Sequence, residues 1–250
     1  MSSSSRQWQH PFVDVFKTFA TDARNSSLPG SLVAEVRGDV SEEMDREICK
    51  RVFRIQGPVC ANNYIQVPSR KVKCMGLTGE YIYLLVKPLE KNFFLIHLDF
   101  VVSSGNRFRI SLSNIYQEGK STYHCINCPC KLPEAWTVVR VHVPPVLELG
   151  SHAAPHGYLL RSLQLCASLM VRGVFTSDRF YSQEDAPREL VGGAVWQWLD
   201  MPELAPWRRE WAMSSPTSLA ELGNFWEDRW KFEEVRLTWL TGASRPNKAN

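Results

Sequence analysis

The 250-residue chain lacks the features that mark several protein classes. No apolar run approaches the roughly 18 residues that a membrane-spanning helix needs. The serine-rich start, residues 1–9, lacks the apolar stretch of a signal peptide. An excess of one charge is also missing, because 29 basic and 26 acidic residues leave a net charge of only +3. Since nucleic-acid binders usually carry a clearly basic domain, we expect neither a nucleic-acid nor a membrane partner.

Catalytic signatures are missing as well. The sequence contains no glycine-rich phosphate loop, no G-x-S-x-G elbow, no H-E-x-x-H pair and no set of kinase motifs. Adjacent carboxylates such as Glu184 and Asp185 lie in a polar stretch that is typical of a solvated surface. We therefore expect a protein that is not an enzyme, with no catalytic residues and no cofactor.

Cysteine is present in a number and spacing that favour free thiols. The seven cysteines are odd in number and scattered, which is typical of reduced cytoplasmic proteins rather than of a disulfide framework. One cluster resembles a metal site, because Cys125, Cys128 and Cys130 follow a histidine and thiolates at such spacing can bind zinc. No second C-x-x-C pair exists to complete it. Buried free cysteines and a small zinc module both stay open.

The central two thirds of the chain show the alternation of half-buried strands. Residues 107–113, 137–143 and 94–100 alternate apolar and polar side chains, and residues 163–171 form the longest such run. Residues 81–86 are apolar on both faces, which predicts a central strand. Glycine, proline and asparagine separate these runs. The pattern predicts an all-β fold, an antiparallel jelly-roll-like β-sandwich with short helical segments.

Both ends of the chain differ from this β domain. Phe12, Val15, Phe16 and Phe19 recur at helical spacing, which predicts a short helix near the N-terminus. Seven of the nine tryptophans fall after residue 194. We expect a β-sandwich domain over residues 7–192, a Trp-rich extension over residues 193–240 and a disordered tail over residues 241–250. The extension either packs on its own domain or anchors on a partner.

Basic residues form two local clusters that are candidates for binding an acidic partner. One is expected on a strand and the other in a loop after the following strand. Their members are Lys50, Arg51 and Arg54 in the first, and Arg70, Lys71 and Lys73 in the second. The alternative is an ordinary solvated face.

Several segments resemble a known family. Residues 177–189 read S-D-R-F-Y-S-Q-E-D-A-P-R-E, and residues 61–68, 77–79 and 107–114 contain Y-I-x-x-P, L-x-G and R-F-R-x-S-x-S-N patterns. In this order they resemble the domain of cilia- and flagella-associated protein 20. The opening segment, residues 8–16, and residues 226–230 resemble the branch of this family found in centriolar WD-repeat proteins. That branch continues into β-propellers, whereas this sequence ends at residue 250.

This resemblance implies a function in the ciliary or centriolar cytoskeleton. Such domains bind α/β-tubulin at the inner junction of ciliary doublet or centriolar triplet microtubules, where they bridge protofilaments beside other junction or centriolar proteins. It implies a location in the axoneme of a cilium or flagellum, or in a centriole or basal body. Further partner-binding candidates then lie in the matching segments: Arg107, Arg109, Asp178, Arg179, Tyr181, Trp226, Arg229 and Trp230. A carbohydrate-binding module with a tryptophan platform and the zinc-stabilised interaction module are the alternatives.

Overall fold

The computed structural model describes residues 8–19, 34–69, 73–89, 92–102, 105–151, 157–191 and 196–201. All of them lie in the first of two units, residues 1–204, and residues 205–250 form the second. The predicted tail and the larger part of the predicted extension therefore lie outside the described residues. No helix within the described ranges is long and apolar enough to cross a membrane.

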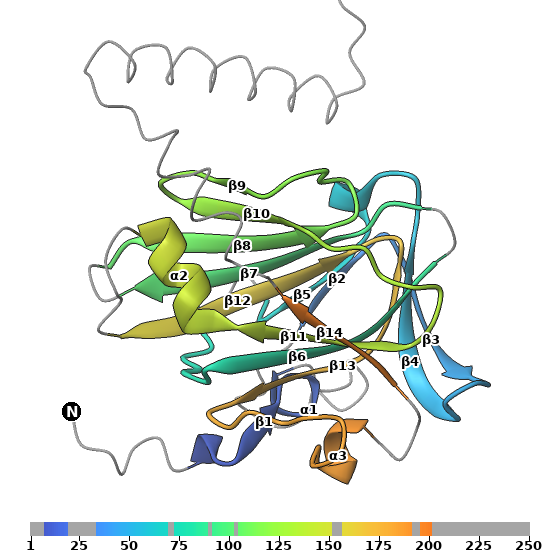
Figure 1. Cartoon of the computed structure of the whole chain (residues 1–250). Helices are drawn as coiled ribbons and strands as arrows, with labels where there is room; N and C mark the ends of the chain where they lie inside the picture. Colours follow the sequence, from blue (N-terminus) through green and yellow to red (C-terminus); the bar gives the residue numbers. More distant parts are fainter. Residues whose placement is uncertain are drawn as a thin grey trace, which may run out of the picture. The chain divides into compact units, whose positions relative to one another are not determined.

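Two seven-stranded sheets make up the domain (Figure 1). The first sheet has the order β14-β11-β6-β13-β4-β3, and β1 also pairs with β13. Its strands are β1 (Phe12–Asp14), β3 (Asp39–Asp45), β4 (Lys50–Gln56), β6 (Tyr81–Pro88), β11 (Thr137–His142), β13 (Leu169–Ser177) and β14 (Gln197–Met201).

The second sheet has the order β2-β5-β12-β7-β8-β10-β9. Its strands are β2 (Glu35–Arg37), β5 (Tyr64–Val67), β7 (Leu95–Val102), β8 (Arg107–Ser113), β9 (Lys120–Ser121), β10 (Cys125–Pro129) and β12 (Tyr158–Cys166). The short helices are α1 (Val15–Phe19), η2 (Cys60–Asn62), α2 (Val143–Ser151) and α3 (Arg188–Val191). The predicted all-β sandwich with short helices is confirmed.

Alternation along each strand builds the core between the sheets. Ile96, Leu98 and Phe100 of β7 are each fully buried and alternate with half-buried residues. β6 is buried over most of its length and pairs with β11 on one side and β13 on the other, as its apolar sequence predicts. Burial of such side chains removes apolar surface from water, which is the main favourable contribution to folding.

Two details differ from the predicted antiparallel arrangement. β8 pairs with β10, and β11 pairs with β14, in parallel, so each sheet is mixed. The run at residues 163–171 is not one strand. The chain bends at Ala167 and Ser168, leaving β12 in the second sheet and β13 in the first. Because both strands contribute side chains to the same core, the alternation continues through the bend and hides it from the sequence.

The N-terminal segment is part of the first sheet. Phe12 to Asp14 form a strand rather than the start of the predicted helix, and they pair with β13 at residues 175–177. The helix α1 begins at Val15, directly after this strand, and buries Val15, Phe16 and Phe19, as the helical spacing predicts for these three residues. The predicted extension also enters this sheet, because β14 pairs with β11 and Trp196 packs against Trp136.

Candidate functional site

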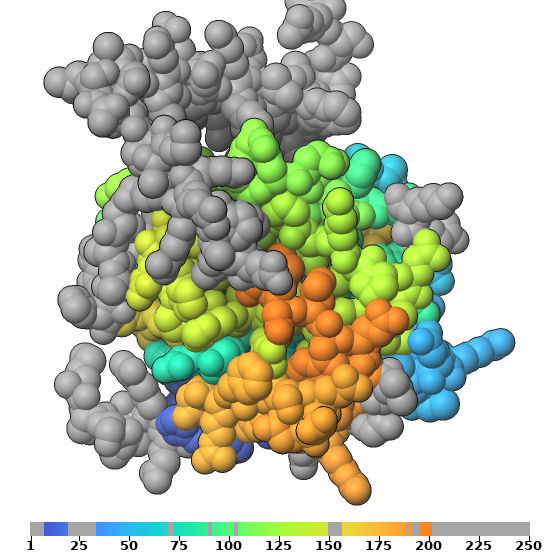
Figure 2. Space-filling model, viewed as in Figure 1, coloured from blue at the N-terminus to red at the C-terminus, as the bar shows by residue number. Residues whose placement is uncertain are grey.

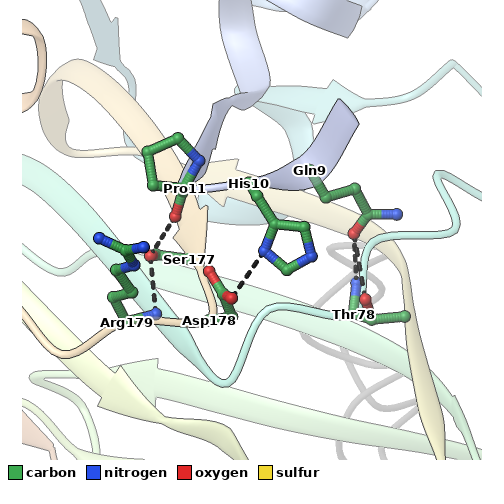
Figure 3. A network of polar contacts seen from close by, with 7 residues as sticks. All are labelled: Gln9, His10, Pro11, Thr78, Ser177, Asp178 and Arg179. Atoms are coloured by element: carbon green, nitrogen blue, oxygen red, sulfur yellow. Dashed lines mark hydrogen bonds and ion pairs between the residues drawn. The ribbon is translucent and has the colours of Figure 1, made fainter. Parts of the chain in front are cut away.

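Three segments that carry the family resemblance meet at one end of the first sheet (Figure 3). They are the opening segment around Gln9, the loop before β6, and the residues that follow β13. The Gln9 side chain joins the first two: its amide nitrogen donates to the Gly76 carbonyl at 3.2 Å, and its oxygen accepts from the Thr78 backbone N–H at 2.9 Å. A Cβ atom on Gly79 would lie 2.8 Å from the Ser177 backbone nitrogen, so the close approach requires glycine there.

The opening segment also bonds directly to the residues after β13. The Ser177 hydroxyl donates to the Pro11 carbonyl at 2.6 Å and accepts from the Arg179 backbone N–H at 2.9 Å. His10 Nδ1 lies 2.6 Å from an Asp178 carboxylate oxygen, and Figure 3 shows the imidazole pointing at that carboxylate. Segments 166 residues apart in sequence therefore form one polar network.

Tyr83 holds the closing motif, residues 177–189, against the outer face of the first sheet. Its hydroxyl donates to the Arg179 carbonyl at 3.0 Å and accepts from the Tyr181 backbone N–H at 2.7 Å. Burial raises the pKa of Tyr83 to about 12, so the hydroxyl stays protonated and can fill both roles at neutral pH. Tyr181 itself is buried at 8% exposure, which gives this predicted binding residue a structural role as well.

Arg140 also holds the closing motif in place, and the sequence alone did not single it out. One guanidinium nitrogen donates to the Tyr181 carbonyl at 2.7 Å, and another lies 2.6 Å from the Asp200 carboxylate. The guanidinium also lies over the Phe180 ring, 3.9 Å from its centre, where a cation is attracted to the aromatic face. Its signal in the sequence is a lone arginine within the apolar strand of residues 137–143.

These contacts leave an exposed surface, which we call the closing-motif surface and define as Trp8, His10, Asp178, Arg179 and Phe180. Trp8 and Phe180 are 53% and 52% exposed, although both are large and apolar. The exposed polar and charged residues His10, Asp178 and Arg179 lie close to them in sequence. Figure 2 shows the closing motif, in gold, on the visible face of the molecule. Exposed aromatic residues with adjacent charges are typical of the anchors in protein interfaces.

The basic candidates lie on separate parts of the domain. Arg51 and Arg54 on β4 lie opposite an acidic edge strand, 3.5 Å from Glu42 and 3.8 Å from Glu43 respectively. Lys50 begins the same strand. The charges of Arg51 and Arg54 are therefore largely balanced by Glu42 and Glu43 of β3.

Of the other basic candidates, Arg107 and Arg109 lie on β8 of the second sheet, and Lys73 lies in the loop before β6. Arg109 on β8 forms a two-bond pair with Asp99, at 2.6 and 3.0 Å, whereas Arg107 is exposed at the start of β8. Lys73 is also exposed. Among the described candidates, Lys50, Arg51 and Arg54 share β4, and Arg107 and Arg109 share β8. Asp178, Arg179 and Tyr181 follow β13 in the closing motif. Five more lie outside the described residues: Arg70, Lys71, Trp226, Arg229 and Trp230.

Two of the candidate zinc ligands, Cys125 and Cys128, lie on opposite faces of the strand that carries them. On β10, Cys128 is buried in the core, whereas Cys125 alternates to the opposite face. Burial raises the pKa of both Cys128 and Cys130 to about 12, which opposes the thiolate form that binds metal. Within the described ranges no group of three His, Cys, Asp or Glu residues is placed to hold a metal ion.

A tryptophan platform for sugar rings is likewise not present in the described part of the chain. Trp136 and Trp196 are buried at 1% and 4% exposure, and Trp198 is half-buried in β14. Trp8 alone among the described tryptophans is exposed. The carbohydrate-binding alternative thus gains no support from this arrangement.

Comparison with known proteins shows the family in which these three segments occur together. The family model of the CFA20 domain matches residues 3–192. The chain belongs to the CFA20 domain family. This confirms the membership that the sequence motifs predict, and the matched range includes all three segments that meet in Figure 3.

Three relatives show what the chain is similar to. WD repeat-containing protein 90 of Homo sapiens is 34% identical over 241 residues, which cover 90% of this chain and 12% of that protein. Centriole proteome protein 16 of Chlamydomonas reinhardtii is 33% identical over 76% of this chain and 9% of its own length. Cilia- and flagella-associated protein 20 of Paramecium tetraurelia is 24% identical over 61% of this chain and 78% of its own length.

The chain thus matches about a tenth of the length of WD repeat-containing protein 90 and of centriole proteome protein 16. The relatives' names are those of ciliary, flagellar and centriolar proteins, which supports the predicted cytoskeletal location at a cilium or centriole. A solved exo-β-agarase gives a TM-score of 0.36 and 10% identity over 70% of this chain and 26% of its own, too weak a similarity to carry an argument.

Proposed function

We propose that this protein is a non-enzymatic structural component of ciliary or centriolar microtubules. In this proposal it binds α/β-tubulin at the inner junction of doublets or triplets and bridges neighbouring protofilaments. The observation that carries the proposal is family membership: the CFA20 domain covers residues 3–192, and relatives bear ciliary and centriolar names.

The architecture suits a structural role. A bridging protein has to hold two partners at a fixed separation, and a two-layer β domain with a well-packed core is a rigid spacer. The opening segment and the closing motif are bonded into one network, so the closing-motif surface has a fixed shape. A preformed surface binds with a smaller loss of conformational entropy than a flexible one.

Charge supplies a second part of the proposal. The microtubule wall is a strongly acidic polymer, so cations without an acidic neighbour contribute most to binding it. Lys73, Arg107 and Arg179 are exposed and have no ion-pair partner among the described residues. By contrast, Arg51 and Arg54 already contact Glu42 and Glu43. We therefore assign the larger contribution to the first three.

Co-sedimentation of the full chain with stabilised microtubules tests this function. The protein is expected to pellet with microtubules at low salt and less at high salt, because salt screens exposed charges. Reversing Lys73 and Arg107 together to glutamate should weaken binding about five- to tenfold, since each exposed charge contact contributes roughly 0.2–1 kcal/mol and its reversal adds repulsion.

The matched control is Lys120→Glu, which reverses a 70% exposed lysine already paired with Glu118 on the short β9 edge. It should pellet like the original protein. Failure to pellet at any salt concentration would contradict tubulin binding itself. Equal loss in the control and the double variant would instead remove the assignment to Lys73 and Arg107.

A further inference from the structure

Within the described residues the two sheets have five edge strands, and four of them are protected against pairing with another chain. An edge strand presents unpaired backbone N–H and C=O groups, and proteins protect such edges by shortness or by charge. In the second sheet, β2 has three residues and β9 has two. In the first sheet, β1 has three residues. β3 has seven, and two of its four acidic residues, Asp39 and Asp45, have no ion-pair partner among the described residues.

The fifth edge strand, β14, has neither kind of protection. It has five residues, Gln197 to Met201, with no proline and no break in its register with β11. Its single charged residue is Asp200, and that charge is neutralised by Arg140 at 2.6 Å. β14 is therefore a regular edge without an unpaired charge. Its residues, in orange, lie on the visible face of the molecule (Figure 2).

The pairing of β14 with β11 fixes which backbone groups point outward. The Gln197 N–H donates to the Trp136 carbonyl, so Gln197, Leu199 and Met201 direct their backbone groups towards β11. In a parallel pair the alternate residues then direct theirs away. Trp198 and Asp200 thus present N–H and C=O groups at the edge, and no strand within the described ranges pairs with them.

Side chains beside this edge define what a further strand would meet. Leu199 is half-buried and lies in register with the buried Val139 on the core face of the sheet. On the opposite face, Trp198 and the Arg140–Asp200 pair lie side by side. An incoming strand would therefore meet an apolar side chain on one face, and an aromatic ring and a neutralised ion pair on the other.

We propose that the outer edge of β14 binds an extended segment of a partner polypeptide, which adds to the first sheet as a further β-strand. The segment is uncharged at its centre, because the edge offers it no unpaired charge, and it is apolar where it lies beside Leu199. Main-chain hydrogen bonds to Trp198 and Asp200 supply the affinity in this mode of recognition.

The position of β14 outside the family domain supports this assignment. The CFA20 match ends at residue 192, and β14 begins at Gln197. The β11 side of the first sheet has thus already been extended by one strand from beyond that domain. The proposed site does not depend on tubulin binding, since its edge groups are separate from Lys73 and Arg107.

A pair of substitutions at one residue tests the proposal. Asp200→Pro and Asp200→Ala both remove the carboxylate, but only proline removes the outward N–H. Proline is tolerated on an edge strand where that N–H faces solvent, so the fold should survive. The probe is an mRNA-displayed library of seven-residue peptides selected on the immobilised full chain, with unselected peptides as the background.

Selection is expected to enrich peptides that are apolar at alternate positions. Their affinity should fall about tenfold in Asp200→Pro, which loses one edge hydrogen bond, and by less than about twofold in Asp200→Ala, which keeps that bond and loses only the carboxylate. Hydrogen exchange on the unsubstituted protein should show new protection of the Trp198 and Asp200 amides. No enrichment, equal binding by the two variants, or protection confined to other strands would overturn the proposal.

Discussion

Replacing Tyr83 by phenylalanine removes one hydroxyl from beneath the closing motif and leaves the ring in place. In the folded protein this hydroxyl accepts from the Tyr181 N–H at 2.7 Å and donates to the Arg179 carbonyl at 3.0 Å. Tyr83 is fully buried, and Tyr181 is 8% exposed. The variant should therefore lose both hydrogen bonds without creating a large cavity.

The two lost bonds have unequal costs. An unsatisfied buried N–H costs about 1–3 kcal/mol, so the Tyr181 amide dominates. Arg179 is exposed, so its carbonyl can bond to water and costs less. We expect Tyr83→Phe to lower the free energy of unfolding by about 2 kcal/mol. For a domain of this size that corresponds to a decrease in Tm of roughly 4–8 °C.

Urea unfolding, followed by tryptophan fluorescence and circular dichroism, measures this difference. Tyr158→Phe is the matched control, because the Tyr158 hydroxyl makes one longer bond, 3.3 Å, to the Gly79 carbonyl at a half-exposed position. It should cost about 0.5 kcal/mol. A Tyr83 variant as stable as the original protein, or a control that loses as much, would refute the account of how the closing motif is held.

Three further predictions concern the ionisation of Tyr83, the Ser177 hydroxyl and the cysteines. Burial raises the pKa of Tyr83 from near 10 to about 12, so its contribution to stability is fully present below pH 10 and is lost as the pH rises towards 12. The free energy of unfolding should therefore fall over this range. A Tyr83→Phe variant whose free energy of unfolding falls equally steeply with pH would contradict the prediction. Ser177→Ala removes the bonds to Pro11 and Arg179 and should cost about 1–2 kcal/mol in a urea titration, whereas the exposed control Ser41→Ala should change little; equal effects would count against a structural role for the opening segment. Thiol labelling of the native protein at pH 8 should modify the exposed Cys49 rapidly and Cys128 only after unfolding, and labelling of both at one rate would show that the second thiol is accessible.

Local alternation made the strands predictable from the sequence, whereas the division of these strands between the two sheets was not predictable from it. The period of two in Phe108, Ile110 and Leu112 depends only on which face each side chain takes, and β8 follows it. The bend at Ala167 leaves the alternation unbroken because both flanking strands face one core. Parallel pairing of β14 with β11 joins Gln197 to Thr137, which are far apart in the sequence, and composition does not reveal such a contact.

The candidate site was predictable in its segments and not in its assembly. The resemblance identified the closing motif and the opening segment separately, but their hydrogen bond joins Ser177 to Pro11 across 166 residues. Arg140 escaped notice because its role depends on three groups, Tyr181, Phe180 and Asp200, that the fold brings together. The charge clusters were visible in the sequence, but the acidic partners of Arg51 and Arg54 became visible only with the pairing of β3.

The location of a tagged full-length chain in a ciliated cell tests the central claim most directly. A structural component of ciliary or centriolar microtubules should give a signal confined to the axoneme or to the centriole and basal body, and retained after detergent removes soluble protein. Signal along the axoneme would indicate the doublet junction, and signal at the basal body would indicate the centriolar triplet. A diffuse signal that detergent extracts completely would contradict the account.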